Sequence, residues 1–240
     1  MATVTFVRIE SLEKRHGAKT IFKALDLSVD AGEFVAVVGP SGCGKTSLLQ
    51  ILAGLDTASN GRCVYGKPDP KIGVVFQNPR LLPWRTVREN LEIVMGEDHR
   101  DGLVEEWIAR VDLADAIDQY PDRLSLGMMR RVALARAFAI EPDLLLMDEP
   151  LVSLDAPTAR KMRALLITLW NLRPHTVIFV THDLREAVEL ADRLLFVSPS
   201  PMQVVADVKV AIPRGERSGE RIEEWVNNLR SGPSGIDAWL

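Results

Sequence analysis

Apolar and polar residues alternate along the first 30 positions of the chain and then give way to one short apolar run. The alternation over residues 3–30 predicts strands with one buried face, and the run Phe34–Val38 predicts a buried strand. From Gly44 to Gly54 apolar residues recur at helical spacing. The pattern therefore predicts strands, then a glycine-rich loop, then a helix.

The rest of the chain predicts an α/β arrangement that a long helical stretch interrupts. A short strand at Ile72–Phe76 precedes residues 86–140, which have mainly helical spacing. Strands and helices then alternate up to a polar tail from residue 213, whose Gly, Ser and Pro residues predict a loose end. The later strands are predicted at Leu144–Met147, Val177–Val180 and 193–198, and the later helices at 156–172, Asp183–Ala191 and Ile222–Leu229.

Composition narrows the class of protein. With 240 residues, 47% hydrophobic and 26% charged, the chain is long enough for one compact domain with a substantial core. A net charge of −4 argues against a nucleic-acid partner. The chain has neither an apolar run of the roughly 20 residues that cross a bilayer nor a secretory signal pattern, and its two cysteines form no disulfide framework. We expect a cytoplasmic protein.

A phosphate-binding motif follows the strand predicted at Phe34–Val38. Positions 39–46 read GPSGCGKT, a complete match to G-x-x-x-x-G-K-[ST] between a strand and a helix. Its glycines let backbone N–H groups converge on phosphate oxygens at a helix N-terminus. Lys45 would neutralise the β- and γ-phosphates of ATP, and Thr46 would bind Mg²⁺. The predicted ATP contacts are Gly39, Pro40, Ser41, Gly42, Cys43, Gly44, Lys45, Thr46 and Ser47.

Two carboxylates end the strand predicted at Leu144–Met147. Parallel sheets bind ligands at the carboxyl ends of their strands, which is where Asp148 and Glu149 are expected. Asp148 suits a place in the Mg²⁺ shell, and Glu149 suits a general base that polarises the attacking water. Two acids at a strand end are by themselves more often a solvated pair, but the phosphate motif favours the catalytic interpretation.

Further motifs follow in a fixed order. Residues 75–87 read VFQNPRLLPWRTV, residues 124–128 read LSLGM, residues 153–155 read SLD, and His182 follows the strand predicted at Val177–Val180. On these motifs the chain resembles the ATPase subunits of ABC transporters over nearly its whole length. The segment 75–87 looks most like the nitrate, sulfonate and taurine importer group.

The resemblance implies a fold. It is an α/β P-loop NTPase core with an N-terminal antiparallel β-subdomain and an inserted helical subdomain at about residues 80–140. All of it would form a single ABC ATPase domain of residues 1–240, with a short C-terminal tail from about residue 213.

The resemblance also implies a role for each later motif. Gln77 would contact Mg²⁺ and the region of the attacking water while coupling to the membrane subunit. Ser125 and Gly127, in the signature motif, would contact the ATP bound by the opposite subunit. Asp155 belongs to the D-loop, and His182 would contact the γ-phosphate.

The mechanism implied by the family is a homodimer that encloses two ATP molecules. Water positioned by Glu149 and His182 would cleave the β–γ bond. The partners would be transmembrane permease subunits and, indirectly, a solute-binding protein, with the chain on the inner face of the membrane. The loop from Gln77 to Arg85 would meet the permease, unless Trp84 is merely a packed loop aromatic. We expect import of a small anionic or organic solute such as nitrate, sulfonate or taurine.

Two positions depart from the family pattern. Leu126 stands where the family usually has glycine, and its Cβ is expected to limit φ and to crowd the phosphate. We therefore expect Leu126→Gly to be tolerated and to raise ATPase activity. His16 stands where the family commonly has an aromatic that stacks on adenine; imidazole can stack with less area, or His16 is an ordinary surface histidine.

Other interpretations remain open. Arg130, Arg131 and Arg136 form either a solvated helix face or a phosphate-binding cluster near Gly127. A soluble ABC-type ATPase of DNA repair or translation typically carries a long coiled-coil insertion or a second cassette, and the 88 residues from Gly39 to Gly127 leave no room for the insertion. A regulatory module with weak hydrolysis is disfavoured by the intact catalytic residues, and a kinase by the lack of an evident acceptor site.

Overall fold

The computed structural model describes residues 4–96 and 100–231, so the end predicted to be loose lies mostly outside the described residues. The chain forms two compact units. The first combines Met1–Pro70 with Thr176–Leu240, and the second is Lys71–His175. Among the described residues, none of the helices has the length and apolar character that a membrane span requires.

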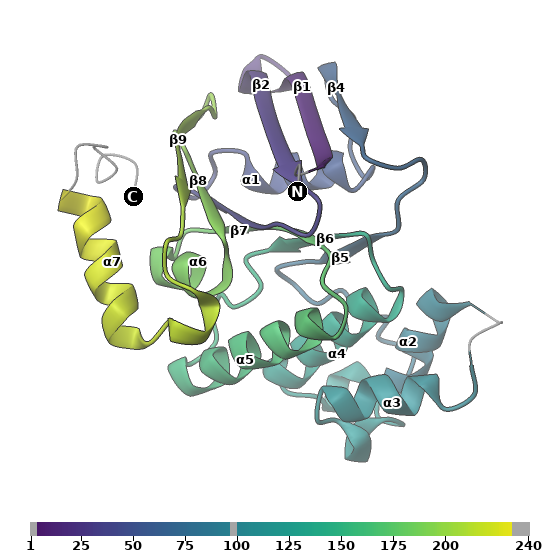
Figure 1. Cartoon of the computed structure of the whole chain (residues 1–240). Coiled ribbons are helices and arrows are strands. Elements are labelled where there is room, and N and C mark those ends of the chain that lie inside the picture. Colours follow the sequence, from purple (N-terminus) through teal and green to yellow (C-terminus); the bar gives the residue numbers. More distant parts are fainter. Residues whose placement is uncertain (1–3, 97–99, 232–240) are drawn as a thin grey trace. The chain divides into compact units, whose positions relative to one another are not determined.

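An antiparallel sheet in the first unit is built from the N-terminal strands. Its order is β2-β1-β4, and Ile9 in β1 pairs with Leu27 on one side and Cys63 on the other. Figure 1 shows the three strands side by side. Val7, Ile9 and Leu12 of β1 are fully buried, as the alternating pattern predicts. The strands are β1 (Thr5–His16), β2 (Lys19–Asp30) and β4 (Asn60–Tyr65).

A second set of strands in the first unit has the order β7-β3-β8-β9. Strand β3 pairs in parallel with β7 and β8, and β9 adds an antiparallel edge to β8. Every residue of β3 and β7 is buried, which explains their unbroken apolar runs. The strands are β3 (Phe34–Val38), β7 (Thr176–Thr181), β8 (Arg193–Val197) and β9 (Val204–Lys209).

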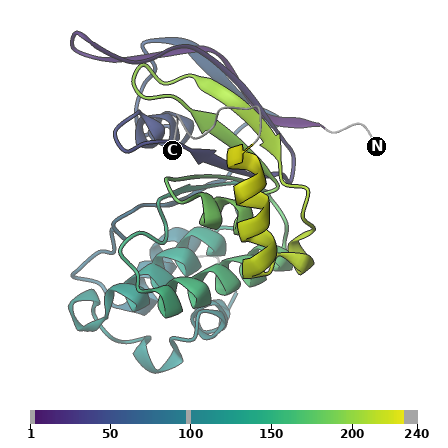
Figure 2. The same cartoon turned by 90° about the vertical axis from the view of Figure 1, so that its left-hand side faces the viewer.

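The helices of the first unit are α1 (Lys45–Leu52), α6 (Leu184–Leu190) and α7 (Gly219–Ser231). The C-terminal helix α7 packs on α6 (Figure 2), and its side chains Ile222 and Val226 are buried. Arg217, just before α7, donates a 3.1 Å hydrogen bond to the carbonyl oxygen of Glu189 at the end of α6. The tail is therefore folded onto this unit up to Ser231.

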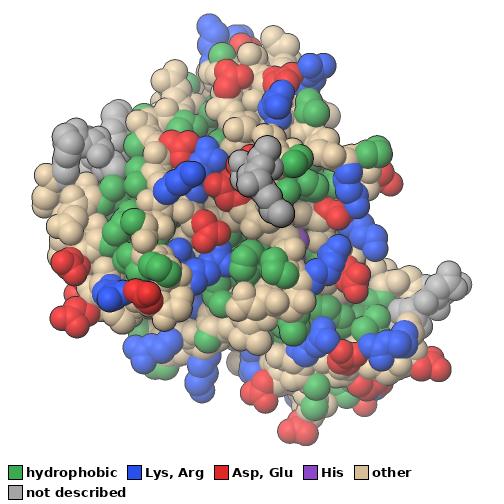
Figure 3. Space-filling view, viewed as in Figure 1, with side chains coloured by type: hydrophobic (Ala, Val, Ile, Leu, Met, Phe, Trp, Pro, Cys, Tyr) green, Lys and Arg blue, Asp and Glu red, His purple; other side chains and the backbone are tan. Residues whose placement is uncertain are grey.

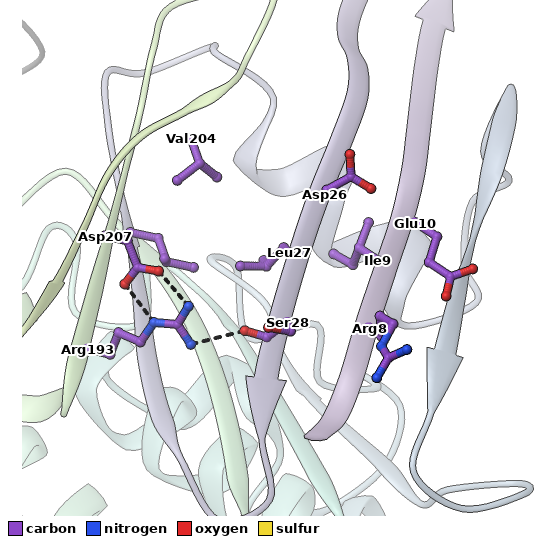
Figure 4. Close-up of a pocket in the computed structure, with 10 residues that line it drawn as sticks. Arg8, Ile9, Glu10, Asp26, Leu27, Ser28, Arg193, Val204 and Asp207 are labelled. Carbon is purple, nitrogen blue, oxygen red and sulfur yellow. Dashed lines mark hydrogen bonds and ion pairs between the residues drawn. The ribbon is translucent and has the colours of Figure 1, made fainter. Parts of the chain in front are cut away.

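Arg193 connects three strands of the first unit. Its guanidinium binds the Asp207 carboxylate of β9 through two hydrogen bonds of 2.7 and 2.6 Å and donates to the carbonyl oxygen of Ser28 in β2 at 3.0 Å (Figure 4). It also forms a 3.3 Å ion pair with Glu33. These residues border a pocket of about 410 Å³ between β1, β2 and the β8–β9 hairpin.

The second unit packs four helices around a parallel strand pair. Strands β5 (Ile72–Val75) and β6 (Leu144–Asp148) pair from Ile72 with Leu144 to Val75 with Met147. Helix α4 contacts α2, α3 and α5, and its residues from Val132 to Ala135 are buried. The helices are α2 (Val87–Met95), α3 (Leu103–Arg110), α4 (Leu126–Ala139) and α5 (Ala156–Leu172).

A buried asparagine organises the loop before α2. Asn90 accepts from the backbone N–H of Leu82 at 2.8 Å and donates to the carbonyl oxygens of Leu82, Arg85 and Thr86. Thr86 and Glu89 form a capping box at the start of the helix. The loop that carries Trp84 is thus held in one shape by side chains of α2.

The strands and helices predicted from the sequence are confirmed, with small differences at their ends. The helix predicted at 156–172 has those bounds, and the tail helix begins at Gly219 rather than Ile222. Two strands, β4 and β9, were not predicted. Both are edge strands with at most partly buried residues, so neither carries an apolar run or a clear alternation.

Candidate functional site

The phosphate loop connects β3 to α1 and needs its glycines for two different reasons. Gly42 and Gly44 have φ values of +76° and +120°, which side chains rarely adopt. Gly39 needs space instead, because a Cβ there would lie 2.5 Å from Cγ2 of Val197. Gly44 is also confined, since its Cβ would meet Cγ2 of Ile21 at 2.5 Å. The local fold thus accounts for three glycines of the motif.

Lys45 is the first residue of α1 and is 5% exposed. Its ammonium donates to the carbonyl oxygens of Gly39 at 2.7 Å and Pro40 at 2.8 Å. An ammonium has three donors, and both acceptors belong to the loop itself. The side chain is therefore directed back over the loop that it is predicted to serve.

The other loop residues divide into exposed and buried ones. Ser41, Gly42 and Thr46 are exposed, whereas Cys43 is buried. Burial raises the pKa of the Cys43 thiol, and the nearby Lys45 charge offsets this only in part. Cys43 is thus a neutral packing residue at pH 7 rather than a reactive thiolate.

His182 lies at the junction of β7 and α6, and its side chain is exposed. The junction is held by Asp183, whose carboxylate accepts from the backbone N–H groups of Arg185 and Glu186. The hydroxyl of Thr181 accepts from the N–H of Asp183 at 3.0 Å and donates to the Glu186 carboxylate. This corner fixes the backbone on both sides of His182.

A pocket of about 420 Å³ adjoins His182 in the first unit. Its other walls come from the start of α6 and from α7, including Glu223, Asn227 and Arg230. His16, the second histidine predicted to act, lies at the end of β1, where it pairs with Lys19, and it is exposed. Its contact with adenine stays a prediction.

The second unit brings the predicted glutamine and carboxylates to one edge of its strand pair. Val75 pairs with Met147, so Gln77 and Asp148 follow neighbouring strand ends. Asp148 is 9% exposed. Glu149 is partly exposed and has a φ of +43°, an uncommon conformation for a residue with a Cβ. Such strain is typical of functional sites.

The signature residues begin helix α4. Ser125 caps the helix, because its hydroxyl accepts from the N–H of Met128 at 3.2 Å. Leu126 is the first helical residue and is 39% exposed. Helical φ is negative, so the expectation that a Cβ at Leu126 limits φ was wrong. Gly127 needs space rather than φ, since its Cβ would lie 3.3 Å from Cγ2 of Thr158.

The D-loop residues lie beside the signature. Asp155 caps α5 by accepting from the N–H of Thr158 at 3.2 Å, and the Thr158 side-chain hydrogen bond is the main reason why the pKa of Asp155 is lowered. A pocket of about 580 Å³ is lined by both motifs, including Ser125, Gly127 and Asp155. The structure therefore brings these three predicted residues together. Thr158 was not predicted, and the only signal for it is its capping distance from Asp155.

The arginines of α4 are not a solvated helix face. Arg130 is 5% exposed. Arg131 donates to the carbonyl oxygens of Val111 and Asp112, at 3.0 and 2.9 Å. Arg136 donates to two carbonyl oxygens of the loop that follows Gln77. The sequence could not show these acceptors, which lie 19 to 57 positions away.

Trp84 is 70% exposed, so it is not a packed loop aromatic. Its loop lies between Gln77 and α2 and is held by Asn90. Tryptophan is enriched at protein interfaces, and the contact of this loop with the permease stays a prediction.

The predicted metal donors fit Mg²⁺ by their chemistry. Thr46, Gln77 and Asp148 supply hydroxyl, amide and carboxylate oxygens, the hard ligands that Mg²⁺ prefers. Among the described residues there is no group of three or more His, Cys, Asp or Glu side chains that could hold a metal. Nucleotide-bound Mg²⁺ needs only one or two protein carboxylates, because phosphates supply further ligands.

Sequence comparison finds relatives along most of the chain. The family profile described as ABC transporter matches residues 22–152, more than half of the chain. An aliphatic sulfonates import ATP-binding protein of Mesorhizobium japonicum is 43% identical, over 88% of this chain and 82% of that protein. Its namesake in Yersinia pestis is 41% identical over 98% and 89%, and that of Bacillus cereus 38% over 85% of each.

Structure comparison finds the same fold in solved proteins. A dimeric ATP-binding cassette in a post-hydrolysis state with ADP and phosphate superposes with a TM-score of 0.75 and 29% identity. The match covers 86% of this chain and all of that one. A dimeric bacterial ABC transporter cassette gives the same TM-score at 28% identity. The predicted α/β P-loop fold is confirmed.

Proposed function

This chain belongs to the ABC transporter family as an ATP-hydrolysing subunit, and we propose that it energises the import of an aliphatic sulfonate. The observation that carries the ATPase function is the phosphate loop between β3 and α1, with its two positive-φ glycines and the Lys45 ammonium directed over it. The cargo is proposed from the relatives, which are named for aliphatic sulfonates. This proposal narrows the expected cargo from nitrate, sulfonate or taurine to aliphatic sulfonates alone.

ATP binds, in this proposal, through the loop Gly39–Ser47. The backbone N–H groups at the start of α1 surround the phosphates, and the partial positive charge of the helix N-terminus favours them. The Lys45 ammonium binds the β- and γ-phosphates as a point charge. The His16 imidazole stacks on the adenine, with less contact area than a larger aromatic ring would have.

Hydrolysis depends on a base and on groups that orient water. Glu149 accepts a proton from the attacking water, while Gln77 orients that water and His182 binds the γ-phosphate oxygens. The strained backbone at Glu149 supports this role, because such strain is retained where it positions a functional side chain. Mg²⁺, held by Thr46, Gln77 and Asp148, supplies neutralisation of charge on the phosphates.

A second copy of the chain completes each ATP site. The exposed Ser125 and the close-packed Gly127 bind the γ-phosphate held by the other subunit, and Asp155 belongs to the same surface. The similarity to dimeric cassettes supports this arrangement. The loop around Trp84 contacts the transmembrane permease, which holds the chain at the inner face of the membrane and receives cargo from a solute-binding protein.

The proposal is tested on the subunit reconstituted in vesicles with its permease. We expect ATPase activity that rises when the binding protein carries an alkanesulfonate and does not rise with nitrate. Glu149→Gln should lower kcat at least about a hundredfold while ATP still binds, because only the base is lost. The matched control is Glu141→Gln, an exposed residue of the same unit.

Stimulation by nitrate but not by alkanesulfonate would contradict the cargo. An ATPase that ignores the permease altogether would contradict the transport function, and a Glu149→Gln variant with normal kcat would contradict the assignment of the base.

A further inference from the structure

Arg136, near the end of α4, forms two hydrogen bonds with the loop that carries Gln77; we call this pair of bonds the grip. Its Nη1 donates to the carbonyl oxygen of Arg80 and its Nη2 to that of Pro79, both at 3.0 Å. The two acceptors are consecutive backbone groups, and a planar guanidinium reaches both at once. Arg136 is partly buried, and this desolvation lowers the pKa of its guanidinium.

The gripped loop has an unusual shape. Arg80 has a φ of +47°, which costs energy for a residue with a Cβ. The Arg80 guanidinium lies 4.1 Å from the centre of the Phe76 ring, so the chain turns back on itself around Gln77. Pro79 is buried and Gln77 is exposed. Asn78 and Arg80 are exposed as well, so the turn is anchored at Pro79 while Gln77 stays accessible to solvent.

Helix α4 connects this grip to the signature. The helix begins after Ser125, and Arg136 lies ten residues beyond Leu126, about 15 Å along the axis at 1.5 Å per residue. Both ends are fixed, by the Ser125 cap at one and the Arg136 hydrogen bonds at the other. The helix interior is packed, with Val132 to Ala135 buried. The loop that carries Gln77 is therefore attached to a rigid helix, so a displacement of this loop acts on α4 as a whole.

We infer that Arg136 is a positioning residue, which sets the glutamine loop against α4 and so relays permease contact at that loop to Gln77 and to the signature. This inference rests on the proposed transport function. Arg136 touches neither ATP nor water in this role. It acts through the backbone carbonyls of Pro79 and Arg80, and the Arg80 side chain supports the same turn by stacking on Phe76.

The chain offers a matched control on the same helix. Arg131 also donates to two consecutive backbone carbonyls, of Val111 and Asp112, at similar distances. Those carbonyls belong to the turn after α3 and not to the glutamine loop. Arg136 uses both Nη atoms, whereas Arg131 makes its bonds from Nη1 alone and also contacts the Asp112 carboxylate at 3.4 Å. Arg136→Lys and Arg131→Lys each replace the guanidinium by a single ammonium. A difference between the two variants therefore measures the effect of releasing the loop that carries Gln77.

The first measurement uses the isolated full-length subunit. We expect trypsin to cleave after Arg80 several times faster in Arg136→Lys than in the wild type, because a freed loop is more accessible to protease. Arg131→Lys should be cleaved there at the wild-type rate. Unchanged cleavage in Arg136→Lys would overturn the inference.

The second measurement uses the complex with permease and loaded binding protein. Arg136→Lys should lower the stimulation of kcat about tenfold, the effect of losing a hydrogen bond to a charged group, and leave the KM for ATP within about twofold. Arg131→Lys should keep its stimulation. Equal losses in both variants, or none in Arg136→Lys, would overturn the inference while leaving the proposed function intact.

A wild-type complex without stimulation would overturn the proposed function and the inference with it. Should Arg136→Lys not fold, Arg80→Gly is the second variant. It keeps the carbonyl acceptors and the φ value but removes the side chain that stacks on Phe76. We expect lower stimulation at unchanged KM, and full stimulation would count against the relay.

Discussion

Leu126 and Gly127 are adjacent residues of one motif, and the backbone constrains them differently. Both lie in the first turn of α4, where helical φ suits any L-residue. Leu126 is partly exposed, while Gly127 faces the methyl group of Thr158. Glycine at position 127 is therefore required by packing, and leucine at position 126 is compatible with the fold.

Leu126→Gly should leave the ATPase activity of the reconstituted complex within about twofold of the wild type. One of the two reasons for the expected rise in activity is removed, because no φ constraint is released at a helical position; crowding of the phosphate by Leu126 stays a prediction. Glycine should cost up to about 1 kcal/mol of stability through helix propensity. Activity assays and thermal unfolding check both statements, and a large loss of activity would show that the Leu126 side chain takes part in the reaction.

Gly127→Ala should lower the free energy of unfolding by about 1 kcal/mol, because crowding of the new Cβ against the Thr158 methyl at 3.3 Å costs about 1–3 kcal/mol and the higher helix propensity of alanine offsets about 1 kcal/mol of this. Thr158→Ser removes that methyl but keeps the hydroxyl that binds Asp155. The double variant should therefore recover much of the loss, which urea unfolding in a double-mutant cycle measures. Additive effects would mean that the two residues do not press on each other.

Single side chains also tie whole elements together. Arg193 in β8 holds β9 through Asp207 and β2 through the carbonyl oxygen of Ser28 (Figure 4). The edge strand β9 has at most partly buried residues, so it gains little from apolar contact. Its attachment depends on backbone pairing to β8 and on this arginine.

Arg193→Met should lower the free energy of unfolding by about 2 kcal/mol, because it leaves the Glu33 and Asp207 carboxylates without their shared cation. Urea unfolding measures the change. Arg62→Met is the matched control, since the Arg62–Glu10 pair is solvent-exposed and should contribute about 0–1 kcal/mol. A similar loss in both variants would mean that burial adds nothing to the Arg193 network.

At the scale of the whole molecule, each unit has its own core, and the second unit also contains a buried histidine. His175 ends the second unit, where its Nδ1–H donates to the carbonyl oxygen of Arg173 at 2.8 Å and its ring packs edge-on to Phe138. Among the described residues its Nε2 has no hydrogen-bond partner. Burial lowers the pKa of His175 below its ordinary value of 6.5, so the folded state keeps the ring neutral.

Acid should therefore destabilise residues 71–175 before the first unit. Below pH 6.5 the unfolded state binds a proton that the folded state does not, so stability falls as pH falls, by at most about 1.4 kcal/mol per pH unit, until the folded pKa is reached. Hydrogen exchange at pH 7.5 and 5.5 should show this loss of protection in the wild type. His175→Leu should reduce it, and an equal pH response in that variant would exclude His175 as the cause.

Strong periodicity made most of the fold predictable. The helix at 156–172 has a long helical pattern, and the apolar run LLLMD is too short for a typical helix, so its length rather than its periodicity favours a buried strand. Edge strands β4 and β9 carry weaker patterns because solvent covers part of them. Charges of both signs are mixed on the face shown in Figure 3.

The candidate site was predictable where its residues lie close together in the sequence. Gly39 to Lys45 form one loop, so spacing alone indicated their use. The acceptors of Arg136 lie more than 50 positions away, and the reason for Gly127 is a methyl group on another helix. Such contacts depend on tertiary packing, which a linear pattern does not contain.

The second unit is inserted between the two sequence segments of the first, and this has a consequence for folding during synthesis on the ribosome. The second unit is one continuous segment and is complete at His175, whereas β3 of the first unit lies between β7 and β8, whose last residue is Val197. Because domains generally fold as units during translation, the inserted unit can complete its internal contacts first. The phosphate loop, encoded early, acquires its supporting strands only when more than four-fifths of the chain has emerged, so a prematurely terminated chain cannot form it in this way.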